Sequence, residues 1–377
     1  MTNTDTLPAP LYIDTQSGLE KLCNHLCSET SIAVDTESDS LYVYHEKVCL
    51  IQFSTPTTDY LVDPLSGIDL SPLGDIFADP AIEKIFHAAE YDIICLRRDY
   101  GFEFTNLFDT MQAARILGFS KLGLSSLLQE FFTVTVDKHF QKANWGKRPL
   151  LPAMANYARL DTHYLIPLRE RLSTALEKAN FTKIAREDFL RIANSSGTPN
   201  EKPQYTSIRG YHKLSPQQLA ILAELCTYRD HIAQQADLPP FKILSSAILL
   251  EAAKFAPTTH EELAKLPGLS DKLLRRHSRG LLEAIKQGAS DPPIYPNHRS
   301  KPSDVYIARL EKLKAWRVQL ARKKSVESDI ILPREIMEDI AKKNPSTRSE
   351  LKSLMQGVPE RFQQYQDSIM HVLKEKG

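Results

Sequence analysis

Four carboxylates in three separate segments are the residues of this 377-residue chain best suited to bind metal ions. Asp35 and Glu37 follow a short apolar run, and alternate residues of a strand point to one face, so the two side chains are expected to lie together. Asp92 lies in the segment HAAEYDI, where a predicted strand is followed by a helix, and Asp161 ends the segment YARLD. Taken alone, each has a structural explanation. An acid in the first turn of a helix, for example, gains about 0.3–1 kcal/mol from the helix dipole.

Tyr157 precedes Asp161 by four positions, and residues four apart on a helix share one face. An ordinary tyrosine titrates at about pH 10, so at neutral pH it keeps its proton and is a poor base. Its hydroxyl can instead hydrogen-bond an attacking water and orient it. A packed tyrosine whose hydroxyl bonds a neighbour is the structural alternative. His163 lies two residues beyond Asp161 and is turned about 200° away on a helix, so we do not expect it to be catalytic.

Considered together, the carboxylates fit the hydrolysis of a phosphodiester. Two divalent ions about 3.5–4 Å apart can neutralise the charge on the scissile phosphate and activate the attacking water. A site with only oxygen ligands selects Mg²⁺ or Mn²⁺ over Zn²⁺. Four carboxylates crowded without metal would repel one another by a few kcal/mol per close pair at an effective dielectric constant of about 20. Such a cluster is difficult to explain as scaffold.

Apolar runs and periodic segments predict the elements that position these residues. Strands are expected over residues 31–35, 48–53, 60–62 and 84–87, and helices over 88–100, 107–117, 124–131 and 153–179. A further helix is expected to begin at Pro72, with Ser71 as its N-cap. Strands that first follow one another and then alternate with helices are typical of an α/β fold with a mixed sheet.

The C-terminal half contains an internal repeat with an offset of 88 residues. The offset superposes Tyr228-Arg229 on Trp316-Arg317, Ile243-Leu244 on Ile331-Leu332, and Glu262-Leu263 on Glu350-Leu351, without a gap. A repeat at a fixed spacing predicts the same small helical domain twice. Tyr228 and Trp316 have apolar neighbours at equivalent positions, so we expect both in the core and not stacked on bases.

Charge is distributed unevenly along the chain. Residues 1–200 contain 18 of the 47 basic residues and 26 of the 47 acidic residues. The rest of the chain contains the other 29 basic and 21 acidic residues. The division suggests that the first part holds metal and the second a polyanion, although solvated helices also vary in charge by chance. The five cysteines contain no CxxC pair, which argues against a disulfide framework or a zinc site. No apolar N-terminal segment and no run of 18 apolar residues occur, so a cytoplasmic protein is expected.

The segments VDTES, HAAEYDI and YARLD resemble the three exonuclease motifs of the DEDD superfamily of nucleases, and the tyrosine of YARLD resembles its tyrosine subclass. The segments FDTMQAARIL and WGKRPL resemble further stretches of ribonuclease D proteins, and the two repeats resemble HRDC domains. The resemblance to ribonuclease D extends along essentially the whole chain. One departure is Ser38, where a large apolar residue often follows the glutamate, which leaves substrate preference in doubt. Asp39 is expected as an outer or surface acid and not as a fifth ligand.

This resemblance implies a ribonuclease H-like exonuclease domain with a mixed sheet flanked by helices, followed by two small all-α HRDC domains. The expected limits are 1–193 for the exonuclease domain, 205–288 and 304–377 for the HRDC domains, and 194–204 and 289–303 for the linkers. It also implies five catalytic residues. Asp35, Glu37, Asp92 and Asp161 would bind two Mg²⁺ ions, for which Mn²⁺ can substitute, and Tyr157 would orient the water.

The implied reaction is hydrolysis of single-stranded 3′ ends of RNA, such as tRNA precursors, to nucleoside 5′-monophosphates. His87, Lys138, Trp145 and Arg148 are the candidate substrate-binding residues. The chain is expected to be a monomer without a membrane partner. Two alternatives stay open. The first is a 3′→5′ exonuclease acting on DNA, because no motif distinguishes the 2′-hydroxyl. The second is an inactive nucleic-acid-binding scaffold, which would lack at least one of the five site residues.

Overall fold

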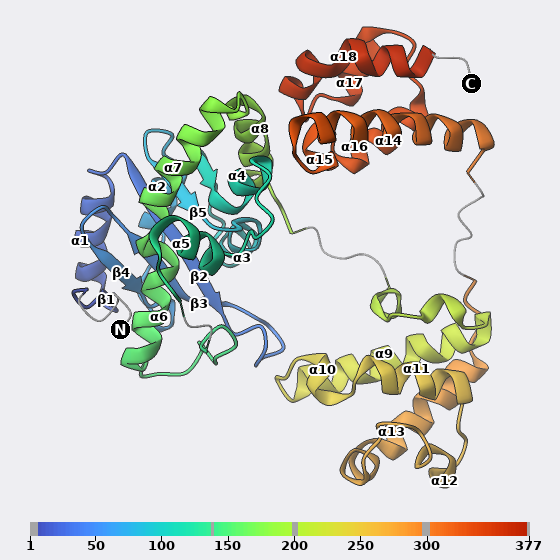
Figure 1. Ribbon diagram of the computed structural model, residues 1–377. Coiled ribbons are helices and arrows are strands. Elements are labelled where there is room, and N and C mark those ends of the chain that lie inside the picture. The colour runs from blue at the N-terminus through green and yellow to red at the C-terminus, as the bar shows by residue number, and fades with distance from the viewer. Residues whose placement is uncertain (1–6, 137–138, 198–202, 296–301, 375–377) are drawn as a thin grey trace. The chain divides into compact units, whose positions relative to one another are not determined.

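The computed structural model describes residues 7–136, 139–197, 203–295 and 302–374 (Figure 1). The chain divides into two compact units. The first comprises residues 1–38, 48–197 and 301–377, and the second comprises residues 39–47 and 198–300. No helix in the described ranges is long and apolar enough to cross a membrane.

A six-stranded mixed sheet forms the centre of the first unit, with the strand order β1-β4-β3-β2-β5-β6. The strands are β1 Leu11–Ile13, β2 Ser31–Ser38, β3 Val48–Ser54, β4 Asp59–Val62, β5 Glu83–Phe86 and β6 Leu107–Asp109. The central strands β2, β3 and β4 pair antiparallel, whereas β1–β4, β2–β5 and β5–β6 are parallel. The residues of β3 and β4 are all buried, which agrees with their almost continuous apolar sequence.

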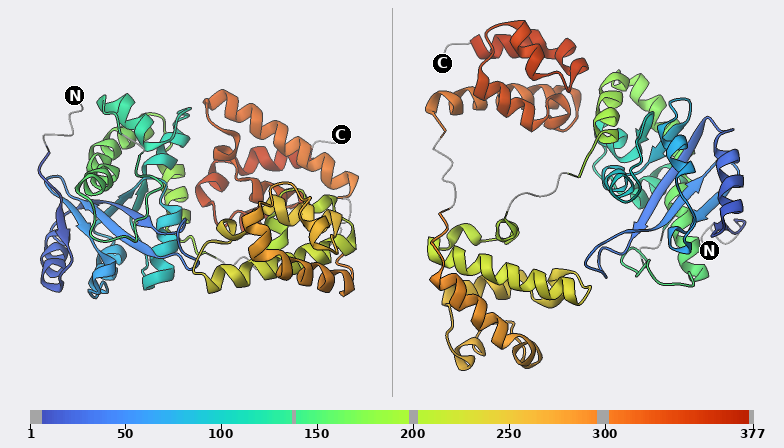
Figure 2. Two further views of the ribbon diagram at one scale, coloured as in Figure 1. Left: turned by 90° about the horizontal axis from the view of Figure 1, so that it is seen from below. Right: turned by 180° about the vertical axis from the view of Figure 1, so that it is seen from behind.

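Helices cover both faces of the sheet (Figures 1 and 2). They are α1 Gln16–Leu26, α2 Pro72–Ala78, α3 Glu90–Tyr100, α4 Thr110–Ile116, α5 Leu124–Phe132, α6 Pro152–His163, α7 Leu165–Lys178 and α8 Thr182–Ala193, with a 3₁₀ turn at Pro64–Ser66. On one face, Leu50 of β3 and Leu61 of β4 share a hydrophobic cluster with Ala158 of α6. On the other face, the ring of Phe53 in β3 stacks on that of Phe77 in α2, with centroids 6.0 Å apart. The expected α/β architecture is confirmed.

Two predicted helices differ from the structure. Leu107–Asp109, predicted as the start of a helix, is the edge strand β6, and the Asp109 side chain accepts a hydrogen bond from the Gln112 backbone at 2.9 Å, so that α4 begins only after it. The helix predicted over residues 153–179 is two helices that meet at Tyr164. Pro167 explains this break, because it lacks the N–H that a continuous helix would bond to the carbonyl of His163.

Ser71 occupies the predicted N-cap position of α2, and Pro72 is the first helical residue, but the expected capping by its side chain is absent. Ser71 has helical dihedral angles, and its side chain makes no capping hydrogen bond to α2. The Ser71 hydroxyl and backbone N–H both donate to the Asp69 carboxylate at 2.9 Å instead.

The internal repeat is confirmed at the level of whole helices. The first copy contains α9 Pro216–Gln235, α10 Pro240–Ile243, α11 Ser246–Phe255, α12 His260–Leu263 and α13 Asp271–Ser290, preceded by 3₁₀ turns at Gln204–Ser207 and Tyr211–Lys213. The second contains α14 Asp304–Lys324, α15 Ser328–Ile331, α16 Arg334–Lys343, α17 Arg348–Leu354 and α18 Pro359–Lys374. Each helix of the second copy begins 88 residues after its counterpart in the first.

Equivalent contacts also recur in the two copies. Arg229 donates to the carbonyl of Leu244 at 3.4 Å, and Arg317 donates to the carbonyl of Leu332 at 2.9 Å. Tyr228 and Trp316 pack against the cores of their copies, as predicted. The two copies have separate hydrophobic cores, but the exact domain limits expected from the sequence stay a prediction.

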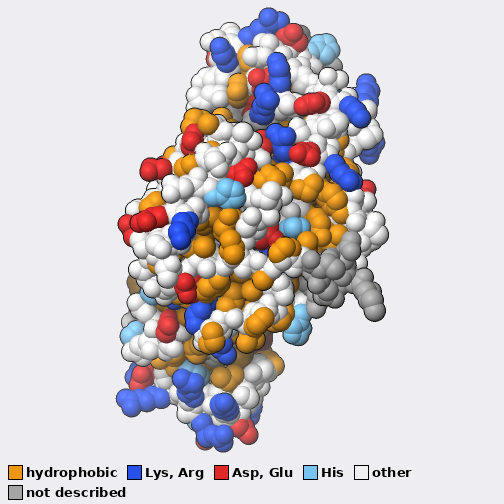
Figure 3. Space-filling model, turned by 90° about the vertical axis from the view of Figure 1, so that its left-hand side faces the viewer, with side chains coloured by type: hydrophobic (Ala, Val, Ile, Leu, Met, Phe, Trp, Pro, Cys, Tyr) orange, Lys and Arg blue, Asp and Glu red, His pale blue; other side chains and the backbone are white. Residues whose placement is uncertain are grey.

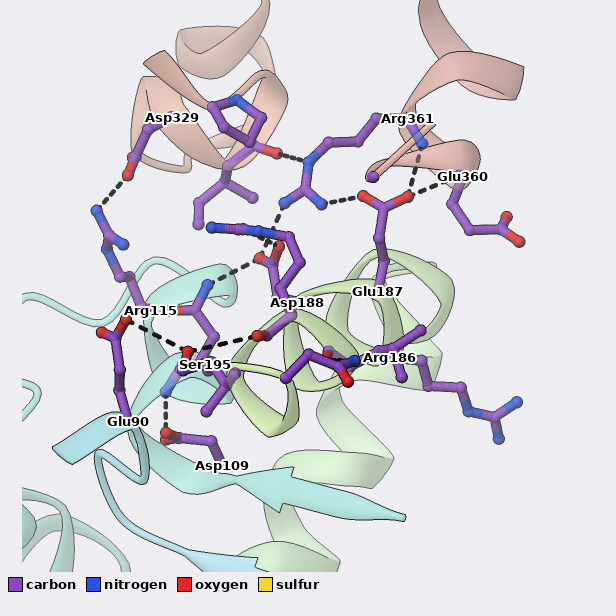
Figure 4. A pocket seen from close by; sticks show the side chains of 18 of the residues that line it. Glu90, Asp109, Arg115, Arg186, Glu187, Asp188, Ser195, Asp329, Glu360 and Arg361 are labelled. Carbon is purple, nitrogen blue, oxygen red and sulfur yellow. Dashed lines mark hydrogen bonds and ion pairs between the residues drawn. The ribbon is translucent and has the colours of Figure 1, made fainter. Parts of the chain in front are cut away.

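A buried ion-pair cluster joins α18 to α8 within the first unit, beside a surface pocket (Figure 4). Arg361 is 1% exposed and donates to Asp188 at 2.9 Å, to Glu187, and to the carbonyl of Ile330 at 2.9 Å. Asp188 also accepts from the Gln112 side chain at 2.8 Å. The second helical repeat is therefore tied to the helix that ends the α/β part of the chain.

Candidate active site

Strand β2 presents Asp35 and Glu37 on the face of the sheet that α6 covers. In the antiparallel register Asp35 lies opposite Gln52 and Glu37 lies opposite Leu50, and residues directly opposite each other share a face. Leu50 packs in the same cluster as Ala158 of α6, which identifies that face. The register shifts after Glu37, so the two carboxylates lie where regular pairing with β3 ends.

Helix α6 carries Tyr157 and Asp161, one turn apart, as the sequence predicted. The Tyr157 ring packs against two other aromatic side chains. Its centroid is 6.1 Å from that of Trp145 and 5.9 Å from that of Phe140. These contacts restrict the ring and hence the position of its hydroxyl.

Asp92 approaches from the first turn of α3, and Asp109 fixes the backbone that leads into this helix. The Asp109 carboxylate accepts hydrogen bonds from the backbone N–H groups of Ala88 at 3.2 Å and Ala89 at 2.8 Å. Ala88 has a left-handed backbone conformation, with φ 63°, which is strained for a residue with a Cβ atom. One oxygen of Asp92 accepts a hydrogen bond from the Thr36 hydroxyl on β2, which ties the second segment to the first.

All four carboxyl groups have raised pKa values, and for Asp35, Glu37 and Asp161 part of the increase comes from the charges of other members of this set. Burial, reinforced by the charges of Asp92, Asp161 and Glu37, raises the pKa of Asp35 well above its usual range. Burial and the neighbouring Asp161 and Asp92 raise the pKa of Glu37 to about 9. Burial raises the pKa of Asp92 to about 7, and burial together with the charge of Asp92 raises that of Asp161 to about 7. Negative charge is therefore costly at this site unless cations compensate it.

This donor set fits divalent metal ions, because it consists of carboxylate oxygens, which hard cations such as Mg²⁺ and Mn²⁺ prefer. Within the described residues, no three His, Cys, Asp or Glu side chains are gathered tightly enough to enclose an ion as they stand. Binding of cations would then have to draw the carboxylates together.

We expect the stability of the metal-free protein to fall as the pH rises from about 5 to about 9. The folded site holds protons that the unfolded chain releases near pH 4, so unfolding releases protons throughout this window and a higher pH favours it. Asp92 and Asp161, at about 7, lose their protons before Glu37, at about 9. Metal binding requires the ionised carboxylates, so the gain in melting temperature from Mg²⁺ over EDTA should increase with pH. A gain that is the same at pH 5.5 and pH 8.5 would contradict the clustering of these groups.

Two candidate substrate-binding residues have other contacts in the structure. Arg148 donates two hydrogen bonds to the Asp63 carboxylate, both at 2.6 Å, and others to the carbonyls of Trp145 at 2.8 Å and Cys49 at 2.6 Å. It thereby fastens the segment around Trp145 to β3 and to the end of β4. Trp145 is 1% exposed. Both residues support the surroundings of Tyr157, and their contact with substrate stays a prediction.

The other sequence candidates lie as follows. His87 follows β5, where its Nδ1 lies 2.9 Å from the Thr110 hydroxyl, and burial lowers its pKa to about 4. Its imidazole is therefore neutral at physiological pH. Lys138 lies outside the described residues. His163, which we did not expect to be catalytic, bonds the Asp59 carboxylate at 2.9 Å.

Asp39 closes the loop after β2 and is not joined to the carboxylate cluster by any contact in the described part of the chain. It is 1% exposed, accepts a hydrogen bond from the Lys47 backbone at 2.9 Å and pairs with the Lys47 ammonium at 3.1 Å. Asp109 is the residue whose importance the sequence reasoning missed. A helix-capping signature was present, because Asp109 precedes Gln112 by three positions. Its bonds to Ala88 and Ala89, however, depend on the parallel pairing of β5 and β6.

Comparison with known protein families finds one match in the α/β part of the chain and one in each helical repeat. Residues 10–177 match the family model described as a 3′-5′ exonuclease. Residues 218–285 and 307–373 each match the model of the HRDC domain.

Individual proteins are similar over most of the chain. A ribonuclease D from Jannaschia sp. (strain CCS1) is 30% identical over 295 residues, which is 75% of each chain. Protein RRP6-like 2 from Arabidopsis thaliana is 34% identical over 290 residues, which is 73% of this chain. This chain spans only 33% of that longer relative. The crystal structure of the catalytic core of RRP6 from Trypanosoma brucei is 32% identical, with a TM-score of 0.66, and covers 75% of this chain and 80% of its own.

Proposed function

Because the chain belongs to the ribonuclease D family, a metal-dependent family of 3′-5′ exonucleases, we propose that it is an exoribonuclease. It removes nucleotides one at a time from single-stranded 3′ ends of RNA and releases nucleoside 5′-monophosphates. The observation that carries this proposal is that Asp35 and Glu37 lie on the sheet face that α6, the helix of Asp161, covers, while Asp92 is tied to the same strand through Thr36.

Asp35, Glu37, Asp92 and Asp161 are the proposed ligands of two Mg²⁺ ions, for which Mn²⁺ can substitute. When bound, the ions would neutralise charge on the scissile phosphate and activate the attacking water. Tyr157 holds that water through its hydroxyl, and its contacts with Trp145 and Phe140 keep the ring in place. His87, neutral at physiological pH, can donate or accept a hydrogen bond to the substrate without adding charge to the site.

The substrate class proposed is single-stranded RNA, of which tRNA precursors are one example. A 3′ end has to reach the metal ions, and a duplex end would have to separate first. We propose further that the protein acts as a monomer in the cytoplasm.

The substrate class is tested with RNA and DNA strands of identical sequence, incubated with the full chain in Mg²⁺ and in EDTA. We expect release of 5′-monophosphates from RNA in Mg²⁺ and none in EDTA. Faster cleavage of DNA would assign the same chemistry to a deoxyribonuclease, and equal rates would contradict a preference for RNA. Binding of RNA without cleavage in either condition would indicate the inactive scaffold.

The first helical repeat provides a candidate RNA-binding surface. Lys272, Arg275, Arg276 and Arg279 are exposed on α13, and Lys and Arg side chains also form patches on the face drawn in Figure 3. Of these four, Arg279 pairs with Glu283 at 2.9 Å. Phosphate contacts made by such residues contribute to affinity and to its salt dependence.

We predict that replacing Lys272, Arg275 and Arg276 by alanine weakens binding of long RNA without changing the rate on a dinucleotide. The slope of log affinity against log salt should fall by about 0.7 for each RNA phosphate whose charge the variant can no longer neutralise. A matched control removes three exposed lysines from the α/β part of the chain, Lys21, Lys121 and Lys178. An equal loss of RNA affinity in both triple variants would show that only net charge matters.

A further inference from the structure

Gln52 lies in the middle of β3 and is completely buried. Neither the nitrogen nor the oxygen of its side-chain amide has a hydrogen-bond partner in the described part of the chain. A buried amide without partners is costly, so such groups are rare in folded proteins. Its neighbours in sequence are apolar, and a leucine at this position would fill similar volume without that cost. The amide can therefore still bond a ligand that supplies the missing donor and acceptor.

The position of Gln52 in the sheet indicates which ligand. It lies directly opposite Asp35 on β2, so both side chains leave the same face and their Cβ atoms are neighbours. The flanking residues on that face both contact α6. Leu50 shares a cluster with Ala158, and the Ser54 hydroxyl bonds the Thr162 hydroxyl at 2.7 Å. Gln52 thus lies beside Asp35 on the face covered by α6, the helix that carries Tyr157 and Asp161.

We propose that Gln52 is a positioning residue of the metal site, an inference that rests on the function proposed above. Its amide N–H₂ donates to the Asp35 carboxylate, and its oxygen accepts from water bound beside the ions. Carboxylates that bind metals are commonly held by such outer hydrogen bonds, which fix their orientation. An amide suits this place because it is neutral. A further carboxylate would add repulsion to a cluster in which burial and neighbouring charges already raise pKa values, and an ammonium would repel the metal ions.

This role predicts a combination of effects that a residue with only a packing role does not produce. In the metal-free protein the amide has no partner to lose, so Gln52→Leu should leave the melting temperature in EDTA unchanged or raised. With metal, the variant lacks the hydrogen bond that orients Asp35, so its affinity for Mn²⁺ should fall by about 10- to 100-fold. A packing residue would behave in the opposite way, because its replacement would lower the melting temperature in EDTA and leave metal affinity unchanged.

The experiment compares the unaltered 377-residue chain with its Gln52→Leu variant. Mn²⁺ binding is measured by calorimetric titration without RNA, and stability by thermal unfolding in EDTA. Gln52→Met repeats the test with a more flexible side chain, in case leucine prevents folding. Ser54→Ala is the matched control, because Ser54 lies two residues along the same buried face and bonds Asp59 and Thr162, both at 2.7 Å. The control should lower the melting temperature in EDTA and leave Mn²⁺ affinity unchanged.

Weakened Mn²⁺ binding by the Gln52 variants, with affinity retained by Ser54→Ala, supports the proposal. Unchanged Mn²⁺ affinity in both Gln52 variants overturns it, as does an equal loss of affinity in Ser54→Ala. The titration of the unaltered protein separates this inference from the proposed function. If the unaltered protein fails to bind Mn²⁺, the metal site itself is refuted, whereas binding that Gln52→Leu does not weaken refutes only the role of Gln52.

Discussion

Replacing Asp161 by asparagine should lower kcat on RNA in Mg²⁺ by about 10³-fold or more while the protein stays folded. Asparagine keeps the shape of the side chain but cannot supply the negative charge that holds a cation. The ions are expected to contribute several kcal/mol to stabilising the transition state, and about 4 kcal/mol corresponds to three powers of ten in rate. Single-turnover cleavage of a short RNA at saturating enzyme measures this loss directly.

The same substitution should raise the melting temperature in EDTA at pH 8. Burial and the nearby charge of Asp92 raise the pKa of the Asp161 carboxyl, so its ionised form destabilises the metal-free fold at that pH. Asp39→Asn is the matched control, since Asp39 is buried near the same strand but pairs with Lys47. It should retain the rate. Retention of the rate by Asp161→Asn would remove Asp161 from the site, and the accompanying gain in stability distinguishes lost metal binding from misfolding.

Replacing Arg361 by alanine should destabilise the attachment of α18 to α8 by about 3–5 kcal/mol, because it leaves buried acids without their cation. Burial already raises the pKa of Glu187 despite the attraction of Arg361. Without the guanidinium, Glu187 and Asp188 would lose their buried charge-assisted hydrogen bonds (Figure 4). Urea denaturation followed by limited proteolysis between residues 301 and 377 measures the effect. We expect cleavage at a lower urea concentration than in the unaltered protein.

Arg348→Ala provides the control, because Arg348 belongs to the same helical repeat and pairs with Asp367 at 2.5 Å on the surface. Exposed pairs contribute only about 0–1 kcal/mol, so this variant should unfold almost as the unaltered protein does. Equal sensitivity of the two variants would show that the Arg361 cluster contributes no more than a surface ion pair.

Local sequence patterns sufficed for the features that depend on near neighbours. The alternation of Asp35 and Glu37 on a strand, the four-residue spacing of Tyr157 and Asp161 on a helix, and the repeat offset of 88 are all present in the structure. They could be predicted because strand and helix periodicity is a property of the backbone. Because four carboxylates in one site would need cations to balance their charge, three segments that are distant in the chain could be predicted to form that site together.

Features that depend on distant partners could not be predicted in this way. The local pattern of Leu107–Asp109 predicts a helix, and the segment is a strand because it pairs in parallel with β5. The local sequence around Arg148 suggests an exposed cation. In the structure Arg148 donates two hydrogen bonds to Asp63, which lies 85 positions away. Gln52 is only a polar residue in an apolar strand until the register places it opposite Asp35. In each case a long-range contact, which leaves no local signal, decides what the side chain does.

The most direct test of the central claim follows the products from one RNA strand with distinguishable labels at its two ends. With the full chain and Mg²⁺, the 3′-terminal label should appear first as a nucleoside 5′-monophosphate, while the 5′-labelled strand shortens one nucleotide at a time. EDTA should stop both processes, and added Mg²⁺ should restore them. Internal fragments at the earliest times, products that carry 3′-phosphates, or cleavage that continues in EDTA would contradict a metal-dependent 3′→5′ exoribonuclease.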